Sequence, residues 1–278
     1  MGNLMARLNK VHFITFGTTE FRVQQECLAR SAQEFGQVDE VELLGPANIK
    51  GTSFYASHRD ILDYPRGAGY WLWKPYLILA KLASVAPGDV VIYSDCGRGS
   101  GYQFHRSALP LIDWAANSGH GAFPGISIPH FGPNAIWTKR DCFVHMACDS
   151  PRFWHHPQIQ ATHSVWIKSS FTCDFVETWL RLCCDPRIIT DAPNACGMDN
   201  LPGFKDHRHD QSVLTNLVIE ANLPFIDGSL GIVGRIIPPK NWNTDLLKDI
   251  NNIILCARGI SAGTIYAMRM LRGRISKF

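Results

Sequence analysis

Charged residues are scarce in this chain of 278 residues. Asp, Glu, Lys and Arg make up 18% of it, whereas soluble domains contain about 25%. The net charge of +3 is too small to indicate nucleic-acid binding, and we expect no nucleic-acid partner. No run of apolar residues approaches the length of about 18 that a membrane-spanning helix needs. The 46% hydrophobic and 11% aromatic content excludes a disordered chain.

Recognisable cysteine patterns and targeting signals are also absent. The nine cysteines are odd in number, none forms a C-x-x-C motif, and two of them are adjacent in a segment with helical spacing. This usage favours a reducing cytoplasm over an extracellular disulfide framework. The first ten residues lack the apolar stretch of a signal peptide. We therefore expect a cytoplasmic protein.

Three common catalytic motifs are missing. No G-x-G-x-x-G follows the first predicted strand, which disfavours a Rossmann dehydrogenase. The chain has no P-loop, which disfavours a P-loop kinase, and no G-x-S-x-G, which disfavours an α/β-hydrolase.

Apolar strands alternate with helical segments in the first hundred residues. Residues 11–16 and 38–44 have strand patterns, and residues 20–35 between them have a helical pattern. A helix predicted over 76–85 precedes a nearly continuous apolar strand at 90–95, which is typical of buried parallel sheets. We predict an α/β fold with one mainly parallel central sheet flanked by helices.

The second half of the chain is less regular. We predict a capping box at 138–141, strands at 122–129 and 159–167, helices at 105–117, 171–184 and 209–221, and a long loop at 190–204. Long loops in compact domains often contact substrates.

Asp95 is the first candidate site residue, because it ends the apolar strand at 90–95. Ligands of open α/β sheets bind outside the carboxyl ends of the strands. A carboxylate there can hold a divalent cation that neutralises a diphosphate. The simpler alternative is a turn residue that accepts backbone hydrogen bonds.

An aromatic segment at 67–75 is the second candidate. It contains Tyr70, Trp71, Trp73 and Lys74, which together could stack on a ring and contact a phosphate. The alternative is that these aromatic side chains belong to the core.

The third candidate is the segment FKDHRHDQS at 204–212, which has two His and two Asp within five residues. His207, His209 and Asp210 could be part of a metal cluster, since histidine and carboxylate suit several transition metals. Alternatively, Asp210 begins a helix, where the helix dipole favours a negative charge.

Four segments together resemble a glycosyltransferase of the GT-A fold. They are VHFITFGT at 11–18, GYWLWKP at 69–75, VVIYSDCG at 90–97 and HRHDQSVLTNL at 207–217. The chain is most similar to bacterial transferases of polysaccharide biosynthesis, over roughly residues 11–230. The sequence from Asp210 onward is more distantly similar to the D-Q helix of retaining, glycogenin-like transferases.

This resemblance implies a nucleotide-sugar donor, with UDP as the expected nucleotide, at the carboxyl edge of the sheet. By resemblance, the donor-binding residues are Thr15, Phe16, Gly17, Lys74, Tyr93, Ser94 and Asp95. The other substrate-binding residues are Tyr70, Trp71, Trp73 and His207.

A divalent cation, Mn²⁺ or Mg²⁺, is implied by the D-x-D motif of the family. Asp95 occupies the first place of this motif, and Gly97 stands where the last acid is expected. His209 could supply a further ligand. Metal dependence is therefore an open question.

The activity that the resemblance implies is sugar transfer to a hydroxyl of a glycan or lipid-linked acceptor. Asp210 would be the base of an inverting mechanism, or would orient the donor while Gln211 faces the anomeric carbon in a retaining one, and the D-Q pattern slightly favours retention. We expect the acceptor at loop 191–206 and at aromatic residues such as Trp137 and Phe131.

Two other functions remain open. The first is a metal-dependent hydrolase built on Asp95, His207, His209 and Asp210. The second is an inactive nucleotide- or glycan-binding domain that has lost the second acid of D-x-D.

The basic excess of the chain lies in its last residues. Residues 250–278 carry five basic residues and no acid, so residues 1–249 sum to −2. We predict a catalytic domain at 1–249 and a basic tail at 250–278, helical over 260–271. The tail either binds anionic lipid at the inner face of the membrane or packs on the domain.

Overall fold

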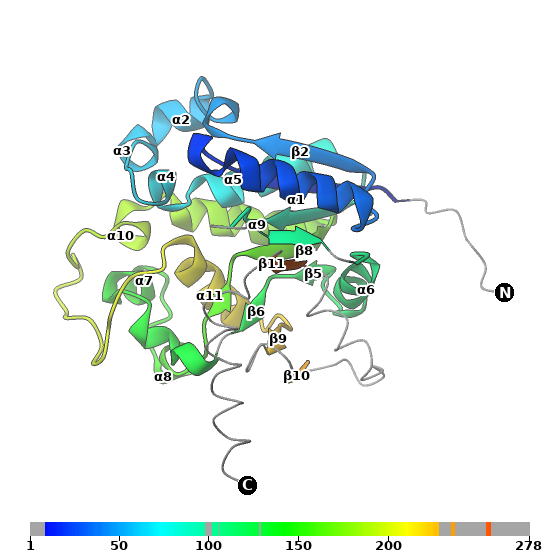
Figure 1. Cartoon of the computed structure of the whole chain (residues 1–278). Helices are drawn as coiled ribbons and strands as arrows, with labels where there is room; N and C mark the ends of the chain where they lie inside the picture. The colour runs from blue at the N-terminus through cyan, green and yellow to red at the C-terminus, as the bar shows by residue number, and fades with distance from the viewer. Residues whose placement is uncertain are drawn as a thin grey trace, which may run out of the picture.

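A five-stranded sheet in the order β2-β1-β3-β8-β5 forms the centre of the fold (Figure 1). The computed structural model describes residues 9–97, 102–104, 106–127, 129–227, 235–236 and 254–256. The strands of the central sheet are β1 (Val11–Phe16), β2 (Glu40–Leu44), β3 (Val90–Ser94), β5 (Ala122–Phe123) and β8 (His163–Ile167).

The α/β architecture is confirmed, and the sheet is mixed. β1 is parallel to both β2 and β3, whereas β8 is antiparallel to both β3 and β5. Half of the four strand pairings are therefore antiparallel, where the sequence predicted a mainly parallel sheet. The apolar pattern of a strand reports its burial and not its direction, so the reversal of β8 could not be read from it.

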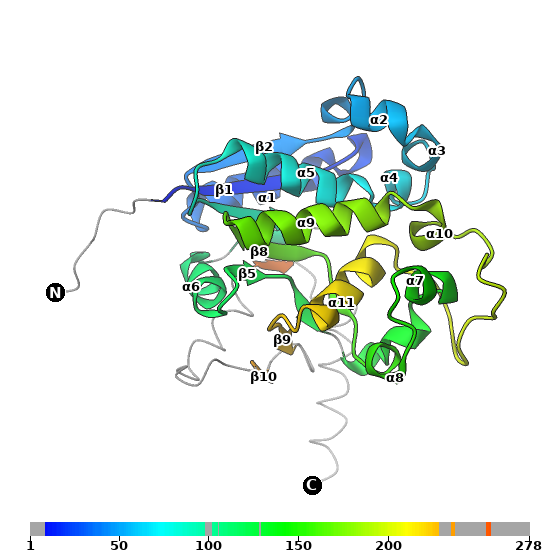
Figure 2. The same cartoon turned by 180° about the vertical axis from the view of Figure 1, so that it is seen from behind.

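Helices cover both faces of this sheet (Figures 1 and 2). Val11 and Phe13 of β1 face one hydrophobic cluster, which includes α1 (Arg22–Glu34) and α6 (Leu109–Asn117). Ile14 and Phe16 face the other cluster, to which α5 (Trp73–Ser84), α9 (Ser170–Cys183) and α11 (Asp210–Glu220) contribute. The alternation along β1 is the period of two that a strand imposes.

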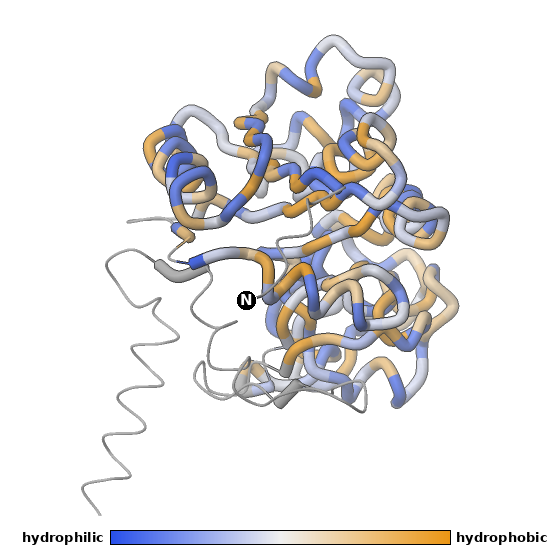
Figure 3. The backbone as a smooth tube through the Cα atoms, turned by 90° about the vertical axis from the view of Figure 1, so that its right-hand side faces the viewer, coloured by the Kyte–Doolittle hydropathy of each residue, from blue (hydrophilic) through white to orange (hydrophobic). Residues whose placement is uncertain are grey.

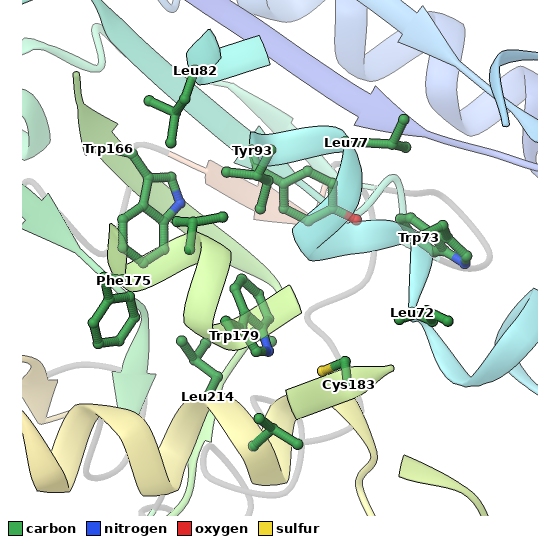
Figure 4. Close-up of a cluster of buried hydrophobic side chains, with 14 of the residues drawn as sticks. Leu72, Trp73, Leu77, Leu82, Tyr93, Trp166, Phe175, Trp179, Cys183 and Leu214 are labelled. Carbon is green, nitrogen blue, oxygen red and sulfur yellow. The ribbon is translucent and has the colours of Figure 1, made fainter. Parts of the chain in front are cut away.

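The second cluster joins elements from distant parts of the sequence. Trp166 of β8 and Trp179 of α9 are fully buried, and Leu214 of α11 lies nearby (Figure 4). Tyr93 of β3 also belongs to this cluster. Packing of these large side chains ties α5, α9 and α11 to the sheet, which positions the ends of those helices.

The remaining elements are short. They are η1 (Thr19–Phe21), η2 (Pro46–Asn48), α2 (Ser53–Ser57), α3 (Arg59–Leu62), α4 (Gly67–Tyr70), β4 (Tyr102–Phe104), β6 (Ile126–Ser127), η3 (Pro129–Phe131), η4 (Asn134–Ile136), α7 (Arg140–His145), α8 (Pro151–Trp154), β7 (Ile159–Gln160), α10 (Pro186–Ile189), β9 (Ile226–Asp227), β10 (Arg235–Ile236) and β11 (Ile254–Cys256). A second sheet has the order β10-β9-β6-β7, and β11 pairs with β4.

Two predicted strands are each divided in the structure. The segment 122–129 forms β5 and β6, separated by Pro124 and Gly125. Proline lacks the N–H that a ladder needs, and Gly125 lies so close to the backbone of Gln160 that a Cβ would come within 2.2 Å of its oxygen. The segment 159–167 forms β7 and β8, which Ala161 and Thr162 connect.

Hydrophobic and hydrophilic stretches alternate along the chain (Figure 3). No helix within the described ranges has the length and apolar character needed to cross a membrane. The predicted basic tail at 250–278 lies outside the described residues except for β11, and so does its predicted helix. The division of the chain at residue 249 stays a prediction.

Candidate functional site

The carboxyl ends of the parallel strands define one edge of the central sheet. Gly17 follows β1, and Asp95 follows β3 at the same edge. Because β8 runs the opposite way, its first residue, His163, pairs with Ser94 there. This is the edge at which ligands of α/β sheets bind.

A cavity of about 800 Å³ opens at this edge. Phe16, Gly17 and Asp95 line it on the sheet side, and Trp71 and Trp73 line it on the helix side. Phe16 stacks on Trp73 with ring centroids 3.8 Å apart. The cavity therefore combines flat aromatic surfaces with the carboxylate of Asp95 at the end of a strand, and Glu20 and Asp63 line it as well.

Two cationic side chains, Lys50 and Arg66, also line the cavity. The guanidinium of Arg66 donates to Asp191 at 2.9 Å and to Asp206 at 2.6 Å. These two bonds leave further N–H groups of Arg66, because a guanidinium carries five. Lys50 is exposed.

The aromatic segment enters the site through a left-handed turn. Five successive residues have positive φ, with values of 61°, 51°, 96°, 52° and 60° from Gly67 to Trp71. Left-handed backbone costs about 1–2 kcal/mol for each residue that carries a Cβ. Gly69 is required here, because a Cβ would lie 2.6 Å from the Cα of Leu62.

Lys74, in the first turn of α5, lies at the centre of the site. Its Nζ donates to the Ala161 carbonyl at 2.9 Å and lies 3.2 Å from carboxylate oxygens of both Asp95 and Asp210. The residue is 3% exposed. Burial opposes the charged form, but the two carboxylates outweigh it and raise the pKa of Lys74. Three oxygens therefore surround the ammonium, which does not line the cavity.

Asp95 connects this buried ammonium to the cavity. Its Oδ1 contacts Lys74 and accepts the Tyr93 hydroxyl, while the carboxylate side chain keeps 27% exposure. Ser94 donates its hydroxyl to the Asp95 carbonyl at 2.9 Å and accepts from His163 Nδ1 at 2.8 Å. Tyr93 and Ser94 thus support Asp95 and are themselves buried away from the cavity.

Burial keeps His163 neutral beside this carboxylate. The pKa of the imidazole falls to about 4 because burial disfavours its charged form, which outweighs the attraction of Asp95. The single hydroxyl hydrogen of Ser94 is donated to Asp95, so Nδ1 of His163 carries a hydrogen.

Asp210 is the first residue of α11, one residue after the predicted start of this helix at 209. It is 3% exposed, and burial raises its pKa to about 7 despite the opposing effect of Lys74. Its backbone carbonyl accepts the indole N–H of Trp179 at 2.9 Å. Gln211, the next residue, donates its amide to Gln158 at 2.6 Å.

Backbone groups occupy the ring nitrogens of His207. Nδ1 accepts from the Lys139 N–H at 3.3 Å, and Nε2 donates to the Ile188 carbonyl at 2.8 Å. Burial lowers the pKa of His207 well below its usual value. The cluster required by the hydrolase alternative is therefore not assembled around this residue.

His209 is buried and has φ 50° and ψ −120°, which an L-residue rarely adopts. Nδ1 donates to the Ile189 carbonyl at 2.7 Å, and Nε2 lies 3.7 Å from Asp191. The ring packs on Tyr70 and Trp71 at centroid distances of 4.8 and 5.6 Å.

Asp95 offers a divalent cation only one unengaged carboxylate oxygen, Oδ2. Lys74 and Tyr93 already hold Oδ1 of the carboxylate. Gly97 has φ 74°, and a Cβ there would lie 2.7 Å from the Tyr102 ring, so no acid fits this place. No cluster of three potential metal ligands occurs in the described part of the chain. The Mn²⁺ or Mg²⁺ requirement stays a prediction, and no step below uses a metal.

Of three other predicted site residues, Trp73 lines the cavity, whereas Thr15 and Tyr70 are buried and do not line it. Thr15 is buried in β1, and its carbonyl accepts the amide of Gln25 at 3.0 Å. Tyr70 is buried and stacks on Tyr64 at 4.5 Å. The indole of Trp73 donates to the Gly67 carbonyl at 2.9 Å. Trp73 belongs to the hydrophobic core and also lines the cavity.

The long loop after α10 is held by many hydrogen bonds. Buried Asp141 accepts the N–H groups of Ala195 and Cys196 at 2.8 Å each, and the Lys139 ammonium donates to the carbonyls of Thr190 and Ala192. The predicted capping box at 138–141 is therefore wrong, since the acid binds this loop and no side chain caps α7.

The predicted acceptor residues lie near this loop. Trp137 packs beneath the guanidinium of Arg208 at 4.5 Å from the ring centroid, and its indole donates to the Phe131 carbonyl. Phe131 itself is 47% exposed. Their role in acceptor binding stays a prediction.

Sequence reasoning missed three residues that the fold brings to the site. Arg66 directly precedes the aromatic segment, so its position was a usable signal. His163 and Gln158 have no motif around them, because strand pairing and a buried hydrogen-bond network bring them into place.

Comparison with known proteins adds no relative: no protein-family model matches the chain, and no curated protein matches it significantly.

Proposed function

We propose that this protein is a GT-A-like glycosyltransferase. It transfers a sugar from a nucleotide-sugar donor, with UDP as the expected nucleotide, to a hydroxyl of a glycan or lipid-linked acceptor. The observation that carries this proposal is Asp95, which Lys74 holds in the wall of an aromatic cavity of about 800 Å³ at the carboxyl edge of the sheet.

The chemistry of the cavity suits a nucleotide sugar. Phe16, Trp71 and Trp73 offer flat surfaces for a base or a sugar ring. Lys50 and Arg66 supply positive charge to the same cavity, where a diphosphate needs it. A volume of about 800 Å³ is within the range of small-molecule sites.

The reaction separates charge, and this protein stabilises both ends. Negative charge develops on the leaving nucleoside diphosphate, where Lys50 and Arg66 of the cavity wall act. Positive charge develops on the sugar, where the carboxylate of Asp95 acts. Lys74 prevents Asp95 and Asp210 from repelling each other and keeps Asp95 in one orientation.

Asp210 is too deeply buried to reach an acceptor hydroxyl in this arrangement, since its carboxylate faces Lys74. We assign it an orienting role and give Gln211 the place beside the sugar, which extends the expected slight preference for a retaining mechanism. The configuration of the product relative to the donor, read by NMR, tests this assignment.

Thermal shift with UDP-, GDP-, CMP- and dTDP-sugars, with and without Mn²⁺, tests the proposed function. Binding raises the melting temperature in proportion to the logarithm of ligand over dissociation constant. Asp95→Ala should abolish transfer, while Asp113→Ala, an exposed acid on α6, should leave transfer unchanged. Full turnover by Asp95→Ala would refute the donor-site assignment.

For location, we propose a cytoplasmic protein that binds the inner face of the membrane through its basic tail. Co-sedimentation with anionic vesicles should fall when residues 258–278 are removed. Equal sedimentation of the full and shortened chains would contradict this.

A further inference from the structure

A buried glutamine lies between η4 and α11. Gln158 is 5% exposed, and its Nε2 lies within hydrogen-bond distance of four oxygens. These belong to Asn134 Oδ1 at 3.1 Å, Trp137 O at 3.3 Å, and the hydroxyls of Thr138 and Ser212 at 3.2 Å each.

The surroundings of Gln158 fix which way its amide points. The Trp137 carbonyl can only accept, so the atom of Gln158 that faces it is the NH₂ group. Asn134 is fixed in the same way, because its Nδ2 donates to the Phe153 carbonyl at 3.2 Å and its Oδ1 therefore faces Gln158. The carbonyl oxygen of Gln158 must point the other way.

That oxygen determines the orientation of Gln211. It accepts from Gln211 Nε2 at 2.6 Å, and an oxygen in this place rules out the flipped amide of Gln211. The NH₂ group of Gln211 is thus engaged, and its carbonyl oxygen is the amide atom that does not face Gln158. The side chain of Gln211 is half-buried. Among the described residues, no hydrogen-bond donor is seen for this carbonyl oxygen.

We propose that Gln158 is a positioning residue that makes Gln211 present its carbonyl oxygen, and not its NH₂ group, to the reacting sugar. This inference rests on the proposed function. An oxygen stabilises the positive charge that develops at the anomeric carbon, whereas an NH₂ group repels it. The network from Phe153 through Asn134 and Gln158 thus selects one of the two faces of the Gln211 amide.

NMR of the side-chain amides tests the orientation without any substrate. In protein labelled with ¹⁵N-glutamine, the Gln211 signal is the one lost in Gln211→Met. We expect slow hydrogen exchange for this signal, and fast exchange in Gln158→Leu. Thr215→Val is the matched control, because it removes buried hydrogen bonds to the backbone of Ile159 in β7 and of Gln211 in α11 and leaves both glutamine side chains intact. Fast exchange in the unmodified protein would overturn the proposal.

Kinetics with the nucleotide sugar that gives the largest thermal shift test the consequence. Gln158→Leu should lower kcat by at least about tenfold and change KM by less than about twofold. In the Gln211→Met background, Gln158→Leu should have no further effect on kcat, because it acts through Gln211. Multiplying effects, or an equal loss of kcat in Thr215→Val, would overturn the positioning role.

The two proposals fail in different ways. Absence of binding and turnover with every nucleotide sugar would refute the proposed function and with it the catalytic role of Gln211. The exchange experiment would still decide whether Gln158 fixes the amide.

Discussion

The ring of Trp71 stacks on the ring of His209, with centroids 5.6 Å apart and planes inclined by 25°, and both residues have positive φ. Trp71 lies three residues before Lys74, and His209 directly precedes Asp210. The strained segments around Trp71 and His209 therefore pack against each other next to the ion pair of Lys74 and Asp210. Such strain persists only where the surrounding structure holds it, and it concentrates at functional sites.

Replacing Ala68 by glycine should stabilise the protein. Ala68 has φ 51° in the left-handed turn, so removal of its Cβ relieves strain of about 1 kcal/mol. Ala83→Gly is the control, because Ala83 is exposed inside the right-handed helix α5 and its loss should cost about 1 kcal/mol. Urea denaturation measures both. The same sign for the two variants would contradict the left-handed turn.

Loss of the buried ammonium should be costly. Lys74→Met leaves the carboxylates of Asp95 and Asp210 without their shared cation, and breaking a buried ion group costs about 3–5 kcal/mol. Adding Asp210→Asn should recover part of this loss. Lys10→Met removes an exposed ion pair with Glu40 and should cost less than about 1 kcal/mol. Equal losses for the two lysines would contradict the buried site.

The pKa of Asp210 makes stability depend on pH. Burial raises this pKa from 3.8 to about 7 on folding, so the folded protein binds the proton more tightly than the unfolded chain does. The resulting stability is complete below about pH 4 and is lost as pH rises towards 7. As pH rises from about 4 to 7, the free energy of unfolding of the unmodified protein should therefore fall relative to that of Asp210→Asn. A pH-independent difference between the two would contradict the raised pKa.

Restoring the second acid of D-x-D should fail. Gly97→Asp places a Cβ 2.7 Å from the Tyr102 ring at a φ of 74°, so the variant should lose stability and gain no affinity for Mn²⁺. Gly119→Asp is the control, because a Cβ at that left-handed glycine meets no atom within 4 Å. Calorimetric titration with Mn²⁺ and thermal melting measure the two effects. A stable Gly97→Asp that binds Mn²⁺ tightly would contradict this geometry.

Arg66 should contribute to the binding of the phosphates of a nucleotide and not to the binding of its base. Arg66→Met should weaken UDP binding by about tenfold and leave uridine binding within about twofold, because the guanidinium contributes to charge recognition. Asp206→Asn breaks the same ion pair but removes a negative charge, so it should leave UDP binding equal or tighter. Weaker UDP binding in both variants would indicate that Arg66 only anchors the loop.

The sequence predicted the parts of the fold that depend on local pattern. The strand at 11–16 is confirmed to the residue, and Asp210 does begin a helix. The hydrophobic pattern did not show that β8 is antiparallel. It did not show the left-handed turn either, because Gly67 and Gly69 indicate a turn but not its handedness.

Proximity in the site was harder to predict. A backbone carbonyl such as that of Ala161 has no sequence signature, yet it completes the surroundings of Lys74. Gln158 depends on acceptors from η4, from Thr138 in the segment before α7, and from α11, which only the packed fold brings together. The sequence therefore pointed to residues within motifs, Tyr93 and Ser94 among them, and missed supporting residues outside the motifs, such as Gln158 and His163.

The oxygens around Lys74 have a consequence for how the chain folds. All three come from later parts of the sequence, the last of them from Asp210 at the start of α11. Until α11 has docked, the ammonium lacks the carboxylate of Asp210, and its burial away from water is unfavourable. Contacts of such long sequence separation slow folding. A cut within loop 190–206 should therefore leave two halves that fold only together, as one cooperative unit.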